Sequence, residues 1–147
     1  MGLLCRLGSG LCALPLDCVV ETMRPLPIER LSRAPDFVLG VAVVRGQPVP
    51  VIDGARLVGA AETAAPGRLV TLRVGQRRAA LAVTGVVGVR DLGGLPLGAL
   101  PPLLEGAAGD VVTAIGALDD QLLLVLGAAR AVPAAVWDAL PAPGATK

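Results

Sequence analysis

The chain has 147 residues, a formal net charge of +1 and a hydrophobic content of 54%. This length is typical of one domain or of two very small subdomains that share a core, and the near-zero charge gives no general attraction to nucleic acid or to an anionic membrane. The apolar residues occur in short runs that are broken by some of the 19 glycines and 13 prolines. No run approaches the roughly 18 apolar residues that a membrane-spanning helix needs. Short apolar runs with many turn-forming residues favour an all-β fold.

The chain begins with a predicted hairpin. Residues 3–7 and 11–14 are apolar, and the sequence Gly-Ser-Gly at 8–10 separates them, as in a tight turn. Residues 16–24 then predict a one-turn helix that passes into a strand. Pro25 and Pro27 end regular structure after that strand.

Three cysteines, Cys5, Cys12 and Cys18, fall in these first elements. They are odd in number and lack the spacing of a zinc site, and the chain has no histidine to complete one. We therefore expect free cysteines that act as small hydrophobic residues in a reducing cytoplasm. The N-terminus lacks a basic region followed by a long apolar stretch, so a signal peptide is not expected.

The most informative stretch is a predicted hairpin in the first half of the chain. Residues 37–44 and 49–52 are rich in β-branched residues and flank the polar break Arg45-Gly46-Gln47. Gly46 permits the positive φ of a tight turn, and Asp53-Gly54 ends the second run. Arg45 is thus predicted at the tip of the hairpin. A single arginine in a turn can be a solvated charge without a binding role, and this alternative stays open for Arg45.

The second half repeats this organisation of short strands and turns. A helical turn is predicted at 55–58, ended by Gly59, followed by an exposed connector at 60–67. Strands are then predicted at 69–74 and 77–83, joined by the turn Gly75-Gln76, and at 86–89, followed by a long ordered loop at 93–109. The last predicted elements are strands at 111–118 and 121–126 joined by Asp119-Asp120, a segment of helix formers at 128–140 interrupted by Pro133, and a frayed tail at 142–147.

The residues that catalysis needs are scarce. The chain has no histidine and no tyrosine, and its one adjacent acidic pair in the second half, Asp119-Asp120, is placed as a hairpin turn. A phosphate-binding glycine loop followed by Lys-Ser or Lys-Thr is missing, as is the Gly-x-Gly-x-x-Gly pattern. Phe37 and Trp137 are the only aromatic residues, are most simply core anchors, and give no base-stacking surface. We expect no enzyme activity, no metal and no cofactor.

Residues 34–53 resemble the central signature of the CheW family, the adaptor proteins of bacterial chemotaxis. The residues in register are Ala34, Pro35, Phe37, Val38, Gly40, Val41, Arg45, Gly46, Pro50, Val51, Ile52 and Asp53. The step Val19-x-Glu21 matches the strand that follows the family's first one-turn helix, and the resemblance extends over about residues 3–132. Two positions depart from the family: Thr84, where an acidic residue is common, and Val43-Val44, where Asn-Leu is frequent.

The resemblance implies an all-β, CheW-like fold of two small five-stranded SH3-like barrels with short helical connectors. Residues 1–147 would form a single CheW-like domain, with barrel halves at roughly 15–66 and 67–126, terminal segments that complete them, and a flexible tail at 141–147.

The resemblance also implies a function. The chain would be a non-catalytic adaptor that couples chemoreceptors to the CheA histidine kinase, in the cytoplasm at receptor arrays. The family's receptor-binding groove, carried over by position, gives Val19, Glu21, Gly40 and Arg45 as the residues that contact the receptor's cytoplasmic tip. The kinase's regulatory domain would pack against the first barrel.

Alternatives remain open for single residues and for the whole chain. Val19 can be a core strand residue, Gly40 a β-bulge, and Asp53 a cap on the following turn. The chain can serve a chemosensory pathway that controls surface motility or a second messenger, or, from another class, be a small β-barrel enzyme or ligand-binding protein. A detached kinase module is less favoured, because the first predicted strand follows Met1 directly.

Overall fold

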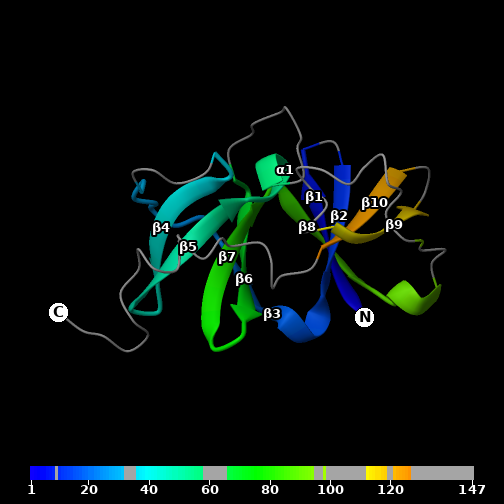
Figure 1. Cartoon of the computed structure of the whole chain (residues 1–147), viewed down its shortest axis with the longest axis horizontal. Coiled ribbons are helices and arrows are strands. Elements are labelled where there is room, and N and C mark those ends of the chain that lie inside the picture. Colours follow the sequence, from blue (N-terminus) through cyan, green and yellow to red (C-terminus); the bar gives the residue numbers. More distant parts are fainter. Residues whose placement is uncertain are drawn as a thin grey trace.

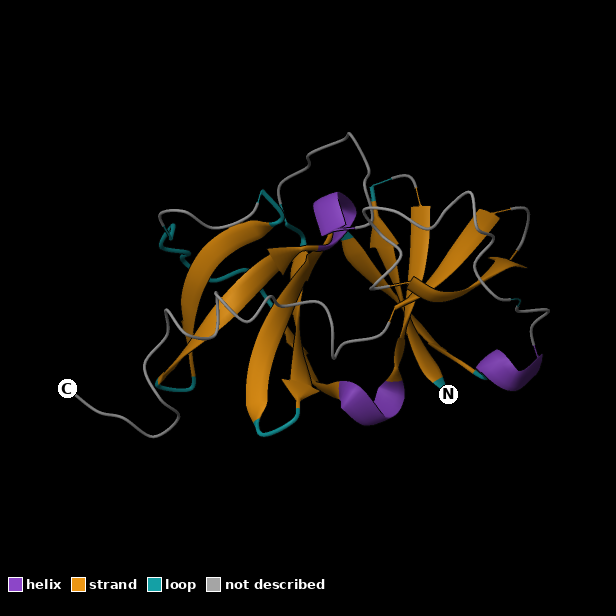
Figure 2. Cartoon of the chain, viewed as in Figure 1, coloured by secondary structure: helices purple, strands orange, loops and turns teal. Residues whose placement is uncertain are grey.

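The computed structural model describes residues 1–8, 10–31, 36–57, 66–94, 98, 112–118 and 121–126. This part of the chain is almost entirely β-structure, with three helical segments of one turn or less, at η1 (Leu16–Cys18), α1 (Gly54–Leu57) and η2 (Leu92–Gly94). The strands form two groups that lie side by side (Figures 1 and 2). The predicted all-β class is therefore correct.

Each group is a five-stranded sheet. The central sheet has the order β3-β6-β7-β5-β4, and the terminal sheet has the order β8-β1-β2-β10-β9. The strands of the central sheet are β3 (Val19–Met23), β4 (Val38–Val44), β5 (Gln47–Asp53), β6 (Arg68–Val74) and β7 (Arg77–Val83). Those of the terminal sheet are β1 (Gly2–Leu7), β2 (Gly10–Pro15), β8 (Gly85–Arg90), β9 (Val112–Leu118) and β10 (Gln121–Leu126).

Among the described residues, no continuous ladder of hydrogen bonds joins the two edge strands of either sheet, so neither sheet is a closed barrel. Each is instead joined across its opening by one isolated bridge. Glu29, which follows edge strand β3, pairs with Val41 of the opposite edge strand β4 through two hydrogen bonds of 2.8 and 2.7 Å. In the same way Gly98, which follows β8, pairs with Ile115 of β9. The predicted five-stranded units are present, as curled sheets rather than closed barrels.

The two sheets have the same topology in a permuted chain order. If the strands of the terminal sheet are counted β8, β9, β10, β1, β2, its order becomes identical to that of the central sheet counted β3 to β7. The single parallel pairing also falls at the equivalent place, between β5 and β7 in one sheet and between β10 and β2 in the other. The first two strands of the chain thus complete the sheet that its last three strands begin.

The strands are divided between the sheets at a different place from the one that the sequence predicted. The predicted halves, 15–66 and 67–126, would assign β6 and β7 to the second unit. In the structure β6 pairs with β3 and β7 pairs with β5, so both belong to the central sheet. Local patterns of apolar residues predict strands but carry no signal for which distant strand each one joins, which is why this boundary was misplaced.

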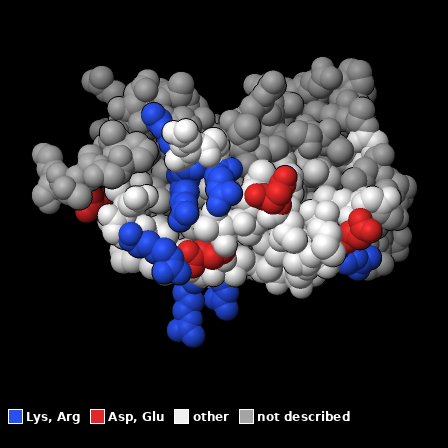
Figure 3. Space-filling view, turned by 90° about the horizontal axis from the view of Figure 1, so that it is seen from below, with Lys and Arg blue, Asp and Glu red and all other residues white. Residues whose placement is uncertain are grey.

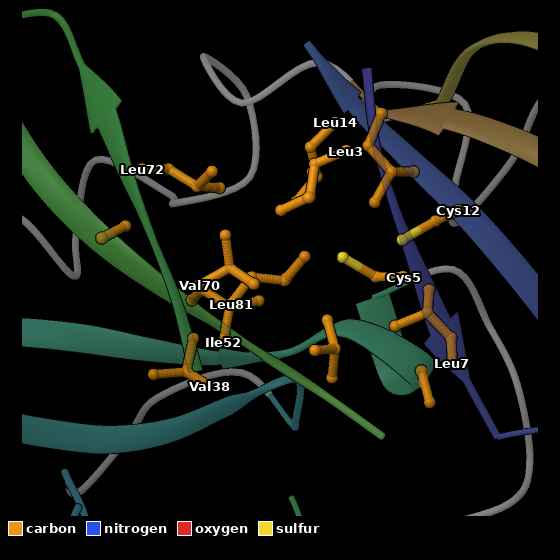
Figure 4. Close-up of a cluster of buried hydrophobic side chains, with 14 residues drawn as sticks. Leu3, Cys5, Leu7, Cys12, Leu14, Val38, Ile52, Val70, Leu72 and Leu81 are labelled. Carbon is orange, nitrogen blue, oxygen red and sulfur yellow. The ribbon is translucent and has the colours of Figure 1, made fainter. Parts of the chain in front are cut away.

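The two sheets pack face to face through an apolar cluster, the inter-sheet core, in which buried residues of both sheets meet (Figure 4). Its buried members are Leu3, Cys5, Leu7, Cys12, Leu14, Val38, Ile52, Ala55, Val70, Leu72, Ala79, Leu81, Val83 and Leu126. Each sheet also encloses a cluster of its own on its other face. Strands such as β1 and β7 are consequently buried on both faces, which explains their continuous apolar runs in place of the alternation of a half-exposed strand.

Several predicted features lie outside the described residues. These are Ser9 in the first turn, Pro35, Val58 and Gly59, most of the connector at 60–67, nearly all of the loop at 93–109, the turn Asp119-Asp120, and the segments 128–140 and 142–147 with Trp137.

Candidate functional site

Arg45 lies at the tip of the β4–β5 hairpin, as the sequence predicted, but in an unexpected backbone conformation. The turn consists of Arg45 and Gly46 alone, with φ values of 49° and 81°. Two-residue hairpin turns of type I′ need positive φ at both central positions, for which Asn, Asp and Gly are the favoured residues. Arg45 is the one residue other than glycine with positive φ in the described part of the chain. A backbone strain of this kind is often found where a side chain has a function.

The side chain of Arg45 forms a two-pronged ion pair with Glu21. Its Nε donates to Glu21 Oε2 at 2.6 Å, and its Nη2 donates to Oε1 at 2.7 Å. Such parallel bonds fix the plane of the guanidinium as well as its position. Glu21 is on β3 and Arg45 follows β4, which are the two edge strands of the central sheet. The curl of the sheet therefore brings together two predicted site residues that are 24 positions apart in the chain.

The ion pair is at the surface. The Arg45 side chain is 70% exposed and that of Glu21 is 26% exposed. The hydrogen bond from Arg45 lowers the pKa of Glu21, and the charges of Arg45 and Arg78 act in the same direction. The same bond raises the pKa of Arg45. Both groups are thus charged at neutral pH, and because an exposed pair adds little to stability, the main effect of the pair is to orient Arg45.

A buried hydroxyl holds Glu21 in place. β3 has an irregularity in its register between Val19 and Glu21, where regular pairing with β6 is interrupted. Thr71 of β6, which is 1% exposed, accepts a hydrogen bond from the Glu21 amide at 3.1 Å and donates one to the Glu21 carbonyl at 3.2 Å. Sequence analysis did not find Thr71 as a site residue. The only available signal was a hydroxyl residue with apolar residues on both sides in the strand, at a position that packing makes fully buried.

Val19 lies two residues before Glu21 on the same strand. It is half-buried, pairs with Leu72 and packs against the edge of the inter-sheet core. The core alternative for Val19 therefore agrees with its surroundings, although part of its side chain stays exposed on the same strand as Glu21.

Gly40 does not join this group. It lies five residues before Arg45 on β4, which corresponds to about 16 Å along a strand. Gly40 is buried at a register shift, has φ of 145°, and an added Cβ would overlap the carbonyl oxygen of Glu29. The Glu29–Arg30 backbone crosses directly over it. This geometry favours the β-bulge alternative for Gly40 over direct contact with a partner.

The remaining residues singled out from the sequence have structural surroundings. Asp53 Oδ1 accepts hydrogen bonds from the amides of Ala55 at 3.1 Å and Arg56 at 3.4 Å, so it caps the short helix α1 as predicted. Phe37 is half-buried against the inter-sheet core. Cys5 and Cys12 are fully buried and Cys18 is partly buried, all three as free thiols.

Within the described residues, no group of three or more Cys, Asp or Glu side chains is arranged to hold a metal ion. In the same part of the chain, no helix is long and apolar enough to cross a membrane. What the site offers chemically is therefore a fixed guanidinium, two of whose five N–H donors are used by Glu21, beside an apolar strand edge.

Three comparisons with known proteins agree. The sequence model of the CheW-like domain matches residues 1–135. The chemotaxis protein CheW of Klebsiella aerogenes is 29% identical over 102 residues, which are 67% of this chain and 61% of the length of that protein. The crystal structure of the scaffolding protein TtCheW from Thermoanaerobacter tengcongensis has the same fold, with a TM-score of 0.67 at 22% identity over 86% of this chain and 87% of that one. The match of the family model along nearly the whole sequence shows that this chain belongs to the CheW-like domain family.

Proposed function

We propose that this protein is a cytoplasmic adaptor that couples chemoreceptors to a CheA-type histidine kinase, with the Arg45–Glu21 pair at the receptor-binding surface. The observation that carries the proposal is the two-pronged ion pair across the opening of the central sheet. It occurs in a member of the CheW-like domain family, at two of the positions that sequence resemblance assigned to receptor binding.

The geometry of the pair suits recognition of a helical protein. Glu21 fixes the guanidinium in one plane, and three of the five N–H donors of Arg45 remain for carbonyl or carboxylate oxygens of a partner. Because Arg45 is already ordered before a partner arrives, less conformational entropy is lost on binding. The exposed part of Val19, on the same strand as Glu21, adds an apolar contact for a helix laid along this edge.

Coupling requires no chemistry by the protein itself. An adaptor that binds a receptor with one surface and a kinase with another raises the concentration of kinase near the receptor. The two packed sheets provide a rigid body for this purpose, because the inter-sheet core contains buried residues of both.

A charge swap tests whether Arg45 contacts the receptor or only closes the sheet. The three variants are Arg45→Glu, Glu21→Arg and the double variant, which restores the ion pair with its charges exchanged. We expect Arg45→Glu to weaken binding of a chemoreceptor cytoplasmic fragment from the same genome by about tenfold or more. The double variant should stay weak, since it has a carboxylate in place of the guanidinium at position 45.

Circular dichroism and titration with the CheA regulatory domain are the controls. Each variant should fold and should bind the kinase domain as the wild type does, because the altered side chains are at the surface. Recovery of receptor binding in the double variant would show that the pair has a structural role only. Absence of wild-type binding to both the receptor fragment and the kinase domain would refute the adaptor function itself.

A further inference from the structure

Two more arginines lie next to the Arg45–Glu21 pair and have no carboxylate of their own. Arg73 of β6 and Arg78 of β7 are direct cross-strand partners near the end of the β6–β7 hairpin, and both are exposed. Like charges in directly opposite positions destabilise a sheet. Within the described residues, neither side chain forms an ion pair. The arrangement is unfavourable for the isolated protein and leaves two guanidinium groups available.

Strand pairing places this arginine pair beside β3, because Glu21 of β3 is opposite Thr71, two residues before Arg73 on β6, and Arg78 is the cross-strand partner of Arg73. The charge of Arg78 acts on Glu21, where it helps to lower the pKa of the carboxyl group. The charge of Arg73 acts on Cys18, just before β3, where it opposes the rise in pKa that burial causes. Since Arg45 already neutralises Glu21, that carboxylate does not balance the arginine pair as well.

The charge is local to one part of the molecule. Viewed from below, arginine side chains gather over the half of the molecule that contains the central sheet, around an acidic side chain (Figure 3). The described surface over the other half is mostly uncharged in this view. With a net charge of only +1, the chain therefore has a cationic patch and not a cationic surface. A patch of this extent matches a few acidic side chains better than the long phosphate backbone of a nucleic acid or a membrane plane.

We propose that Arg73 and Arg78 bind acidic side chains on the helix of the receptor tip, next to the contact made by Arg45. The inference rests on the proposed function and names the chemistry of the partner at that surface. Cross-strand neighbours have Cβ atoms about 4.5–5.5 Å apart. Acidic residues four positions apart on a helix are about 5–6 Å apart, so two such residues can meet the two arginines one to one. Each guanidinium can then form the forked pair that Arg45 forms with Glu21.

The test is the salt dependence of binding to a chemoreceptor cytoplasmic fragment from the same genome. Affinity is measured by titration calorimetry at several sodium chloride concentrations for the wild type and for the double variant Arg73→Gln/Arg78→Gln. The wild-type affinity should fall as salt is raised, because exposed charge pairs are screened. The double variant should bind about fivefold to tenfold more weakly at low salt and show a shallower dependence.

Arg90→Gln is the matched control, because Arg90 is an exposed arginine on β8 of the terminal sheet. Its affinity and its salt dependence should equal those of the wild type. Wild-type affinity in the arginine double variant would overturn the inference while the adaptor function stands. A wild type that fails to bind the fragment at any salt concentration would instead refute receptor binding as such. Another outcome is that the wild type binds anionic vesicles or duplex DNA more tightly than the receptor fragment. If the double variant Arg73→Gln/Arg78→Gln loses that binding, the arginine patch recognises phosphate groups and the inference is overturned.

Discussion

Gly40 and Gly46 are both glycines with positive φ on or beside β4, and they differ in what surrounds them. At Gly46 an added Cβ would point into open space, whereas at Gly40 it would overlap the backbone of Glu29. Gly46 is needed only for the conformation of the turn. Gly40 is needed for both its conformation and the close approach of a second segment, which the Glu29–Val41 bridge holds in place.

The substitution Gly40→Ala should destabilise the protein much more than Gly46→Ala. We expect a loss of about 3 kcal/mol or more at Gly40, from backbone strain together with a clash against main-chain atoms. Gly46→Ala should lose about 1 kcal/mol from backbone strain alone. Urea denaturation followed by circular dichroism measures both, and equal losses would contradict the role given to the Glu29–Arg30 crossing.

The ionisation of Glu21 should report on Arg45. The hydrogen bond from Arg45 lowers the pKa of Glu21, so the carboxylate is favoured in the folded state. A lowered folded-state pKa gives a contribution to stability that is present above the ordinary glutamate pKa and is lost as pH falls through the folded value. NMR titration of the Glu21 carboxyl carbon should show a pKa below that of free glutamate, which returns toward it in Arg45→Gln. An unchanged pKa in that variant would mean that the pair is not formed in solution.

At the scale of single elements, β3 shows how an irregular edge strand is used to place a side chain. The interruption between Val19 and Glu21 removes regular ladder bonds, and the Thr71 hydroxyl supplies a donor and an acceptor in their place. As a result Glu21 lies where Arg45 can reach it from the opposite edge of the sheet. A regular strand would not need a polar side chain at this buried position.

Replacement of Thr71 by valine should therefore weaken both the fold and the site. Valine has nearly the same shape but leaves the amide and carbonyl of Glu21 without their side-chain partner, which we expect to lower the free energy of unfolding by about 1–3 kcal/mol. Thr71→Ser keeps the hydroxyl and is the matched control. If Thr71→Val keeps wild-type stability while Thr71→Ser loses it, the methyl group rather than the hydroxyl is what matters at this position.

The sequence predicted the elements better than their arrangement. Most described strands, the one-turn helix before β3 and the capping role of Asp53 agree with the local pattern, because apolar runs and turn residues determine them locally. Gln47 and Pro48 extend β5 beyond the predicted run, since the turn needs only two residues.

The pairing of Arg45 with Glu21 depends on the curl of the sheet, and sequence spacing contains no information about it. The match to the CheW-like domain family confirms the predicted family, and the fold shared with TtCheW confirms the predicted fold.

At the scale of the whole molecule, the inter-sheet core makes the two sheets one folding unit. Leu81 of β7, which is 2% exposed, belongs to it together with Leu3, Leu14 and Leu126 of the terminal sheet (Figure 4). Cys5 and Cys12 are cross-strand partners whose sulfur atoms also lie in this core. Hydrogen bonding to Cys5, together with burial, raises the pKa of Cys12, so that this residue stays a neutral thiol and packs as an apolar group.

The substitution Leu81→Ala should destabilise both sheets together. Deleting a fully buried leucine side chain typically costs about 2–5 kcal/mol, and the loss should appear as a single unfolding transition shifted to lower urea concentration. Hydrogen exchange should speed up in the terminal sheet as well as in the central sheet. Val43→Ala, at a position 66% exposed, should change stability by less than about 0.5 kcal/mol. Two separate transitions in Leu81→Ala would mean that the sheets unfold independently.

The permuted order of the terminal sheet has a consequence for biosynthesis. β1 and β2 are translated before the other strands of this domain, and all strands of the central sheet, β3 to β7, are available once residue 83 has emerged. The first hairpin must wait much longer, because its neighbours β8 and β10 are translated only at residues 85–90 and 121–126. During that interval both of its edges are unpaired and most of its side chains are apolar. A nascent segment of this kind is exposed to aggregation and to chaperone binding, so the β1–β2 hairpin, although translated before the other strands of the domain, would be among the last of them to reach its native surroundings.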